Sequence, residues 1–215
     1  MATGTDIIDL FRSLQWLGLC VAAFLTGSIP FGLLIARAKG IDLRAVGSRN
    51  IGATNVLRSV GKLPALFTLL ADIFKGTIFV AFGRYLVVGV TVEGVIGLCA
   101  ILGHIFSIFL AFKGGKGVAT ALGVFLIYTP LAWGLAIVTW LVSAFVTRYS
   151  SLAALIAFVL LPVYIYILDR SMVKVIVGVG VTLVIFFKHR DNIRRLLNGT
   201  EKKIGQKDYI RRSDG

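Results

Sequence analysis

Long apolar segments recur along the chain, and they constrain its fold more than any other feature. A helix needs about 20 apolar residues to cross the hydrocarbon core of a membrane, which is roughly 30 Å thick. Segments of about this length lie at residues 14–36, 63–82, 92–112, 152–168 and 172–187. The composition agrees, since 57% of the 215 residues are hydrophobic and 15% are charged, against about 25% charged in soluble domains. The sequence predicts an all-α integral membrane protein, with residues 1–215 as a single domain.

A further apolar stretch, residues 118–146, is too long for one helix. At about 1.5 Å per residue it would extend about 44 Å, well beyond the membrane core. Pro130 lacks an N–H donor and disfavours helix at the residue before it, so it turns the chain there. We therefore expect two short spans, residues 118–128 and 131–146, of which the first is marginal in length. The total is then about seven transmembrane helices.

The basic residues decide the orientation. With the N-terminus outside, the cytoplasmic pieces are residues 37–62, 113–117, 147–151 and 188–215. They hold 18 of the 23 Lys and Arg and five of the ten Asp and Glu, so they carry a net charge of +13 and the rest is neutral. Lys and Arg accumulate in cytoplasmic loops of membrane proteins, and a six-span alternative would break this rule. We expect a cytoplasmic C-terminus, with a mobile basic tail from about residue 202.

Three polar segments between the spans carry residue types that suit phosphate. The first, residues 47–58, combines turn-forming glycines, short hydrogen-bonding side chains and an arginine whose planar fork pairs with phosphate. Its candidate substrate-binding residues are Ser48, Asn50, Thr54, Asn55 and Arg58. In a helix that starts at Ala53, Thr54 and Arg58 share one face. The alternative is a polar loop with helix-capping residues.

The second segment, residues 113–120, is a glycine-rich turn that opens the fourth span. Such a turn presents backbone N–H groups at a helix N-terminus, and a lysine adds positive charge, so both favour an anion. The candidates are Gly114, Gly115, Lys116 and Gly117. Gly117 stands where a nucleotide-binding P-loop carries Ser or Thr, which excludes that motif. The alternative is a flexible reversal whose lysines reach the membrane surface.

The third segment follows the last span. His189 and Asn192 are three residues apart, so on a continuing helix they face the same way. Arg194 and Arg195 are interpreted as a basic flank attracted to anionic lipid. His189 and Asn192 are therefore site candidates, and His189 is a candidate catalytic residue together with Lys116 and Arg58.

Other polar residues lie inside or beside the spans. His104, ionisable within the third span, and Ser151, at the start of the sixth, are possible supports of the site. Asp72 and Lys75, three residues apart in the second span, are interpreted as a structural pair.

Several function classes are excluded. Phe109 and Arg194 occupy the last position of the H-x-x-x-x-D pattern that each histidine would begin, so the usual signature of acyl-CoA glycerolipid acyltransferases is missing. The acidic residues are scattered, and Cys20 and Cys99 lie in apolar runs, which gives neither a metal site nor a disulfide framework. We expect no metal and no cofactor. Since membrane orientation explains the basic charge, we expect no nucleic acid partner either.

In order and spacing, these segments resemble the bacterial acyl-phosphate-dependent glycerol-3-phosphate acyltransferase family. The resemblance extends from about residue 27 to 203, and it is carried by residues 47–58, 103–120 and 149–152 with His189 and Asn192. The family often has Gly where Arg49 stands and Pro where Ser107 stands. The resemblance implies a multi-pass protein of the bacterial inner membrane, with seven helices and a cytoplasmic active site.

The resemblance also implies a reaction. A fatty acyl group passes from acyl phosphate to the 1-hydroxyl of glycerol 3-phosphate, which gives lysophosphatidic acid for phospholipid synthesis. Glycerol 3-phosphate, acyl phosphate and membrane lipid are then the expected partners. The residues implied for glycerol phosphate are Ser48, Arg58, Lys116, His189 and Asn192. Those implied for acyl phosphate are Asn50, Thr54, Asn55 and the backbone amides of residues 114–117.

Acyl phosphate is already activated, so we expect direct attack by the glycerol hydroxyl, without a covalent enzyme intermediate. The candidate bases are His189, Asp42, Asp191 and a phosphate oxygen of the substrate, and we favour the phosphate. Two alternatives stay open. One is a transporter of a phosphorylated metabolite, although the inverted repeats typical of transporters are absent. The other is a lipid enzyme with a different donor, such as a phosphatidylglycerol-dependent transferase.

Overall fold

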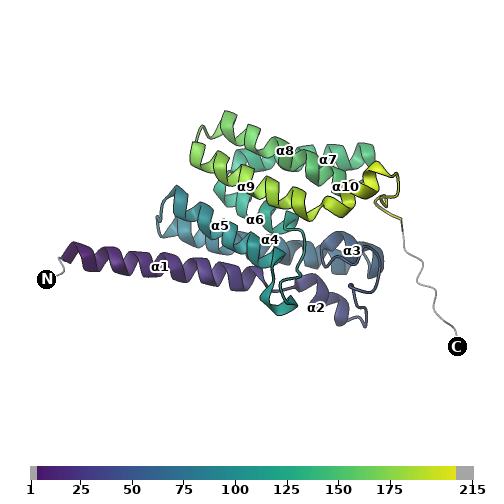
Figure 1. Ribbon diagram of the computed structural model, residues 1–215, viewed down its shortest axis with the longest axis horizontal. Coiled ribbons are helices and arrows are strands. Elements are labelled where there is room, and N and C mark those ends of the chain that lie inside the picture. Colours follow the sequence, from purple (N-terminus) through teal and green to yellow (C-terminus); the bar gives the residue numbers. More distant parts are fainter. Residues whose placement is uncertain (1–3, 207–215) are drawn as a thin grey trace.

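The structure is a computed structural model that describes residues 4–206, and these residues form helices and loops without a strand. Figure 1 shows the longer helices side by side along one general direction. The elements in chain order are α1 (Gly4–Gly27), α2 (Phe31–Arg37), α3 (Ala53–Ser59), α4 (Lys62–Tyr85), α5 (Val90–Ile105), η1 (Ile108–Leu110), α6 (Val118–Tyr128), α7 (Pro130–Thr147), α8 (Ser150–Leu168), α9 (Met172–Lys188) and α10 (Arg190–Leu197).

Five helical stretches in the described part of the chain are long and apolar enough to cross a membrane. They are Phe11–Arg37, Lys62–Tyr85, Val90–Leu110, Pro130–Thr147 and Ser150–Leu168. A sixth results when α9 and α10, which are bent by 61°, are taken together, and α6 is a shorter apolar helix. The all-α architecture predicted from the sequence is confirmed. The total of seven spans stays a prediction, because it depends on how α6 and α9 cross.

Two prolines divide apolar segments, and only one of these breaks is predicted from the sequence. The stretch 118–146 separates into α6 and α7 at Pro130, as predicted. The first span, predicted to be continuous, breaks between α1 and α2 beside Pro30. Lys75 Nζ donates a 2.8 Å hydrogen bond to the Ile29 carbonyl at this break. The same carbonyl accepts from the Phe31 amide at 3.1 Å, so the backbone at the break is hydrogen-bonded within the bundle.

The third predicted span, residues 92–112, ends as a helix at Ile105. The chain then turns through η1 and through Ala111 and Phe112, which both have positive φ angles. Residues 106–117 consequently form one folded loop between α5 and α6. The glycine-rich segment lies in this loop.

Helices α4 and α6 pack with their backbones in close approach. A Cβ atom added at Gly76 would lie 2.1 Å from the Thr120 carbonyl oxygen, and one added at Gly123 would lie 2.0 Å from that of Ile73. Small residues at such crossings are typical of membrane helices, where packing drives association. This contact fixes α6 against α4 directly after the glycine-rich loop.

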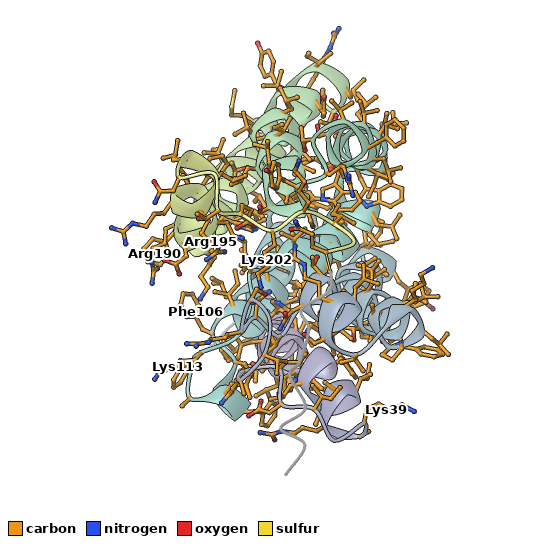
Figure 2. The ribbon with its side chains drawn as sticks, turned by 90° about the vertical axis from the view of Figure 1, so that its right-hand side faces the viewer. Lys39, Phe106, Lys113, Arg190, Arg195 and Lys202 are labelled. Atoms are coloured by element: carbon orange, nitrogen blue, oxygen red, sulfur yellow. The ribbon has the colours of Figure 1, made fainter. Side chains whose placement is uncertain are left out.

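The polar segments gather at one end of the bundle. Figure 1 shows α2, α3 and α10 at the right-hand end, opposite the N-terminus. Figure 2 looks onto this end, and the labelled basic side chains lie on it: Lys39, Lys113, Arg190, Arg195 and Lys202. The structure therefore brings together segments that are more than 100 residues apart in the sequence.

Candidate functional site

A cavity of about 450 Å³ opens at this end of the bundle, and its two walls differ in character. One wall is polar and comes from the α2–α3 loop, α3, the glycine-rich loop, the start of α8 and the α9–α10 bend. The other wall is apolar and comes from α4, α6 and α7. The polar side chains on the cavity are Ser48, Asn50, Thr54, Asn55, Asp72, Arg58, His104, Lys116, Ser150, Ser151, His189, Asn192 and Glu201.

The α3 segment supplies one part of the polar wall. Thr54 and Arg58 both line the cavity from α3, as the spacing of four predicts. The Thr54 hydroxyl lies 3.2 Å from that of Ser150 on α8. Arg58 donates a 2.8 Å hydrogen bond from Nη2 to the Lys202 carbonyl. The guanidinium is therefore held at the mouth of the cavity.

Asn55 has a different task from the direct substrate contact proposed for it. Its side chain is buried, and Oδ1 accepts a hydrogen bond from the Ser48 amide at 2.9 Å. Its Nδ2 lies within hydrogen-bonding distance of three backbone carbonyls, of which that of Asn50 is nearest at 2.8 Å. Since these contacts occupy the amide group, Asn55 shapes the loop that presents Ser48 and Asn50.

The glycine-rich loop folds back onto the end of α5. The Gly114 amide donates to the Ile105 carbonyl at 3.1 Å, and the Gly115 amide donates to the His104 carbonyl at 3.0 Å. These two amides are thus used within the protein, so an anion site here depends on Lys116 and the first turn of α6. Gly117 precedes that turn with φ +87°, a conformation that favours glycine.

Lys116 begins a chain of hydrogen bonds across the polar wall. Its Nζ donates to Asn192 Oδ1 at 2.6 Å, and Asn192 Nδ2 donates to Glu201 Oε1 at 2.7 Å. The same carboxylate oxygen accepts from Ser151 Oγ at 2.7 Å, and Oε2 accepts from Arg195 Nε at 2.7 Å. Glu201 therefore binds three side chains at this end of the bundle, and Ser151, a possible support of the site in the sequence analysis, is one of them.

This environment changes the ionisation of the wall. Burial lowers the pKa of Lys116 to about 8, with Arg195 and Arg58 acting in the same direction and Glu201 against it. Burial would raise the pKa of Glu201, but its hydrogen bonds from Ser151, Asn192 and Arg195 outweigh this and the pKa is lowered. Near neutral pH the wall thus carries a lysine cation that is readily deprotonated above pH 8.

His189 lies at the bend between α9 and α10, where its ring faces the cavity. Its Nδ1 is 2.8 Å from the Ile185 carbonyl, which can only accept, so Nδ1 carries the proton and Nε2 is an acceptor. Burial and the charge of Lys116 lower its pKa to about 4. At neutral pH, His189 is therefore an uncharged hydrogen-bond acceptor.

The sequence interpretation missed two of these residues. Glu201 lines the cavity and accepts three of these hydrogen bonds, but nothing in its local sequence distinguishes it from the rest of a polar tail. The interpretation of Arg195 as part of a basic flank attracted to lipid is wrong, because Arg195 pairs with Glu201. A helical wheel offers the signal: Asn192 and Arg195 are three residues apart and share one face of α10.

The start of the tail expected to be mobile from about residue 202 makes defined contacts. The Lys202 carbonyl accepts from Arg58, and the Ile204 amide donates to the Arg148 carbonyl at 2.7 Å. Lys203 Nζ lies over the Tyr149 ring, 5.7 Å from its centre. Residues 202–204 are thus held against the mouth of the cavity. The rest of the predicted tail, from residue 207, lies outside the described residues.

These features define a class of protein. It is an integral membrane protein whose cavity joins a cationic, hydrogen-bonding wall to an apolar wall, which suits a molecule that carries both phosphate and hydrocarbon. Within residues 4–206, no group of three His, Cys, Asp or Glu side chains is placed to hold a metal ion.

Comparison with known proteins gives the family. The sequence model of the family described as glycerol-3-phosphate acyltransferase matches residues 17–199, and the chain belongs to this family. A glycerol-3-phosphate acyltransferase of Methylobacillus flagellatus is 48% identical over 188 residues, which cover 87% of this chain and 96% of the relative. One of Mesorhizobium japonicum is 51% identical over 191 residues, covering 87% and 95%. The family resemblance drawn from the motifs is confirmed.

A solved structure supports the fold. The crystal structure of PlsY, an integral membrane glycerol 3-phosphate acyltransferase, in its glycerol 3-phosphate form superposes with a TM-score of 0.86 at 38% identity, over 89% of this chain and 96% of that one. Its lysophosphatidic acid form gives 0.83 at 36% identity, over 88% and 95%. The chain is accordingly an integral membrane acyltransferase of phospholipid biosynthesis.

Proposed function

We propose that this protein transfers a fatty acyl group from acyl phosphate to the 1-hydroxyl of glycerol 3-phosphate, with lysophosphatidic acid and inorganic phosphate as products. The observation that carries the proposal is that Lys116 and Arg58 line the same cavity as an apolar wall. Two phosphate groups need several cationic and polar donors, and the hydrocarbon chain needs an apolar surface. Both are present within about 450 Å³.

The acyl chain lies along the apolar wall. This wall consists of Leu66, Leu69 and Ile73 of α4, Leu122 of α6, and Ile137, Trp140 and Leu141 of α7. Leu66, Leu69 and Leu141 are also exposed on the outside of the bundle. The wall is thus continuous with the lipid-facing surface, and an acyl chain enters sideways from the bilayer.

The reaction is a direct displacement. The 1-hydroxyl oxygen attacks the carbonyl carbon of acyl phosphate, the bond from that carbon to the phosphate oxygen breaks, and inorganic phosphate leaves. The hydroxyl proton goes to a phosphate oxygen of the substrate. The protein contributes position and charge: Lys116 and Arg58 stabilise the negative charge, and His189 Nε2 accepts a hydrogen bond from a glycerol hydroxyl. Ser48, Asn192, Asn50 and Thr54 orient the substrates.

The site faces the cytoplasm of a bacterial inner membrane, in a protein with seven spans and an outside N-terminus. The loops that form the mouth carry the excess of Lys and Arg, which favours this orientation. A single cysteine at position 213, in a chain with Cys20→Ser and Cys99→Ser, is expected to react only with a membrane-permeant maleimide in intact cells. Efficient labelling by an impermeant reagent would contradict the orientation.

The donor is tested with purified protein and glycerol 3-phosphate. Palmitoyl phosphate is expected to give lysophosphatidic acid, whereas palmitoyl-CoA under the same conditions gives none above background, because the chain lacks the H-x-x-x-x-D signature of acyl-CoA glycerolipid acyltransferases. Product is measured by mass spectrometry, and the Lys116→Ala variant is the matched control. Equal or faster turnover with the thioester would overturn the assignment of acyl phosphate as donor.

A further inference from the structure

Behind the glycine-rich loop lies a buried charged cluster to which the proposed reaction gives no role. Asp72 and Lys75 of α4 are paired at 2.8 Å, as the sequence predicts, and their side chains are 3% and 1% exposed. His104 in the last turn of α5 is 5% exposed, and its Nδ1 lies 3.6 Å from Asp72 Oδ1. That distance exceeds a hydrogen bond, so the contact orients the imidazole by charge. Both Asp72 and His104 reach the cavity wall.

The opposite edge of the imidazole meets the loop. A Cβ atom added at Gly115 would lie 2.2 Å from His104 Nε2, with the neighbouring ring carbons at 3.0 and 3.1 Å. The backbone of Gly115 therefore rests directly against the ring, and its amide donates to the His104 carbonyl. The next residue is Lys116, whose ammonium group reaches Asn192. A shift of Gly115 would move this lysine.

We infer that Asp72 and His104 form a positioning pair. Asp72 orients the imidazole, the imidazole fixes the position of the Gly115 backbone, and this in turn fixes the position of Lys116 in the phosphate-binding wall. Lys75 balances the carboxylate and also binds the Ile29 carbonyl, so it fixes Asp72 in turn. This inference rests on the proposed function, since it assigns to the pair control over the binding of glycerol 3-phosphate.

The inference is tested by adding a methyl group to the loop at Gly115 and then removing the imidazole ring that this methyl group would strike. Gly115→Ala places a methyl group on the imidazole, and the displaced loop is expected to raise the KM for glycerol 3-phosphate by about 100-fold, the scale of an error of about 1 Å in position. His104→Asn keeps a polar group toward Asp72 but removes the Nε2 edge. The double variant is therefore expected to bind at least about tenfold better than Gly115→Ala alone.

Gly114 provides the matched control. A Cβ atom at Gly114 would lie 2.1 Å from the backbone oxygen of His104, which His104→Asn does not remove. The same change is therefore expected to give Gly114→Ala no recovery. If His104→Asn does not fold, His104→Ala, which also removes the ring edge, takes its place. Thermal unfolding in detergent checks that each variant has a melting temperature near that of the wild type.

Binding is read by titration calorimetry with glycerol 3-phosphate as well as by KM and kcat. Recovery confined to the Gly115 pair, in binding and KM, supports the positioning role. Equal recovery with Gly114→Ala, additive losses in the Gly115 pair, or a wild-type protein without affinity for glycerol 3-phosphate would overturn it. A wild-type protein that binds glycerol 3-phosphate but does not use acyl phosphate would instead overturn the proposed function alone.

Discussion

Replacement of Lys116 by alanine is expected to lower kcat/KM for glycerol 3-phosphate by about 30- to 1,000-fold, the cost of one charge-assisted donor in a site removed from water. Lys116 lines the cavity beside Asn192 and Glu201, and its ammonium group donates to Asn192 at the start of this hydrogen-bond chain. The fold should survive, because Asn192 keeps its bond to Glu201. Initial rates with palmitoyl phosphate, together with thermal unfolding, measure both effects.

The pH dependence gives Lys116 a second signature. Its pKa is lowered to about 8 in the free protein, so it holds its charge at neutral pH and loses it as the pH rises past that value. We therefore expect kcat/KM to fall above about pH 8, and Lys116→Arg to lose this basic limb because arginine does not titrate there. An unchanged basic limb in Lys116→Arg would show that another group titrates.

Arg194 is the control for this experiment. Its side chain is exposed on α10, two residues from Asn192, and it takes no part in the hydrogen bonds that link Lys116, Asn192 and Glu201. Its charge is screened by water and salt, so Arg194→Ala should cost less than about threefold. A loss as large as that of Lys116→Ala would contradict the separation of the site from the basic flank.

Periodicity and charge predict the secondary structure because membrane spans obey two strong constraints: length and sidedness. The division at Pro130 follows from the missing donor alone. The break beside Pro30 does not, since a proline in an apolar span is often accommodated by a kink. At this break the Ile29 carbonyl accepts a hydrogen bond from Lys75, which lies 46 residues further along the chain. The sequence around Pro30 does not predict this contact, because the donor lies in another helix.

In the site, too, local sequence predicts some features, whereas others depend on contacts between distant segments. Residue types that suit phosphate predict Arg58, Lys116, His189 and Asn192, and all four line the cavity. Sequence reasoning cannot separate groups that face the ligand from groups that hold the wall. Asn55 looks like a ligand donor because of its type, yet its amide is occupied by backbone partners.

Glu201 illustrates the reverse case. A lone acid in a basic tail gives no pattern to recognise, and its role appears only when the tail returns to α8 and α10. Hydrogen bonds between residues about 50 positions apart, such as that from Ser151 to Glu201, depend on the fold of the whole end of the bundle. Sequence patterns thus predict the chemistry of this site better than its supporting shell.

The identity of the base can be decided at His189. Its pKa of about 4 makes it a weak base at neutral pH, and its Nε2 is placed to accept a hydrogen bond rather than to donate one. A substrate phosphate, with its second pKa near 6, is the stronger base. We expect His189→Ala to lose about 30- to 300-fold in kcat/KM, as a buried hydrogen-bond partner of the glycerol is removed. His189→Asn keeps an acceptor of similar reach and should retain more activity.

The pH–rate profile then separates the two bases. If phosphate accepts the proton, kcat/KM falls below about pH 6, because the dianion is converted to the monoanion, which is a weaker base and binds the cationic wall less strongly. His189 remains uncharged until about pH 4, so it contributes nothing to that limb. The acidic limb should therefore persist in His189→Asn at the same pH as in the wild type. Loss of the limb in the asparagine variant, with activity as low as in the alanine variant, would assign the proton transfer to the imidazole.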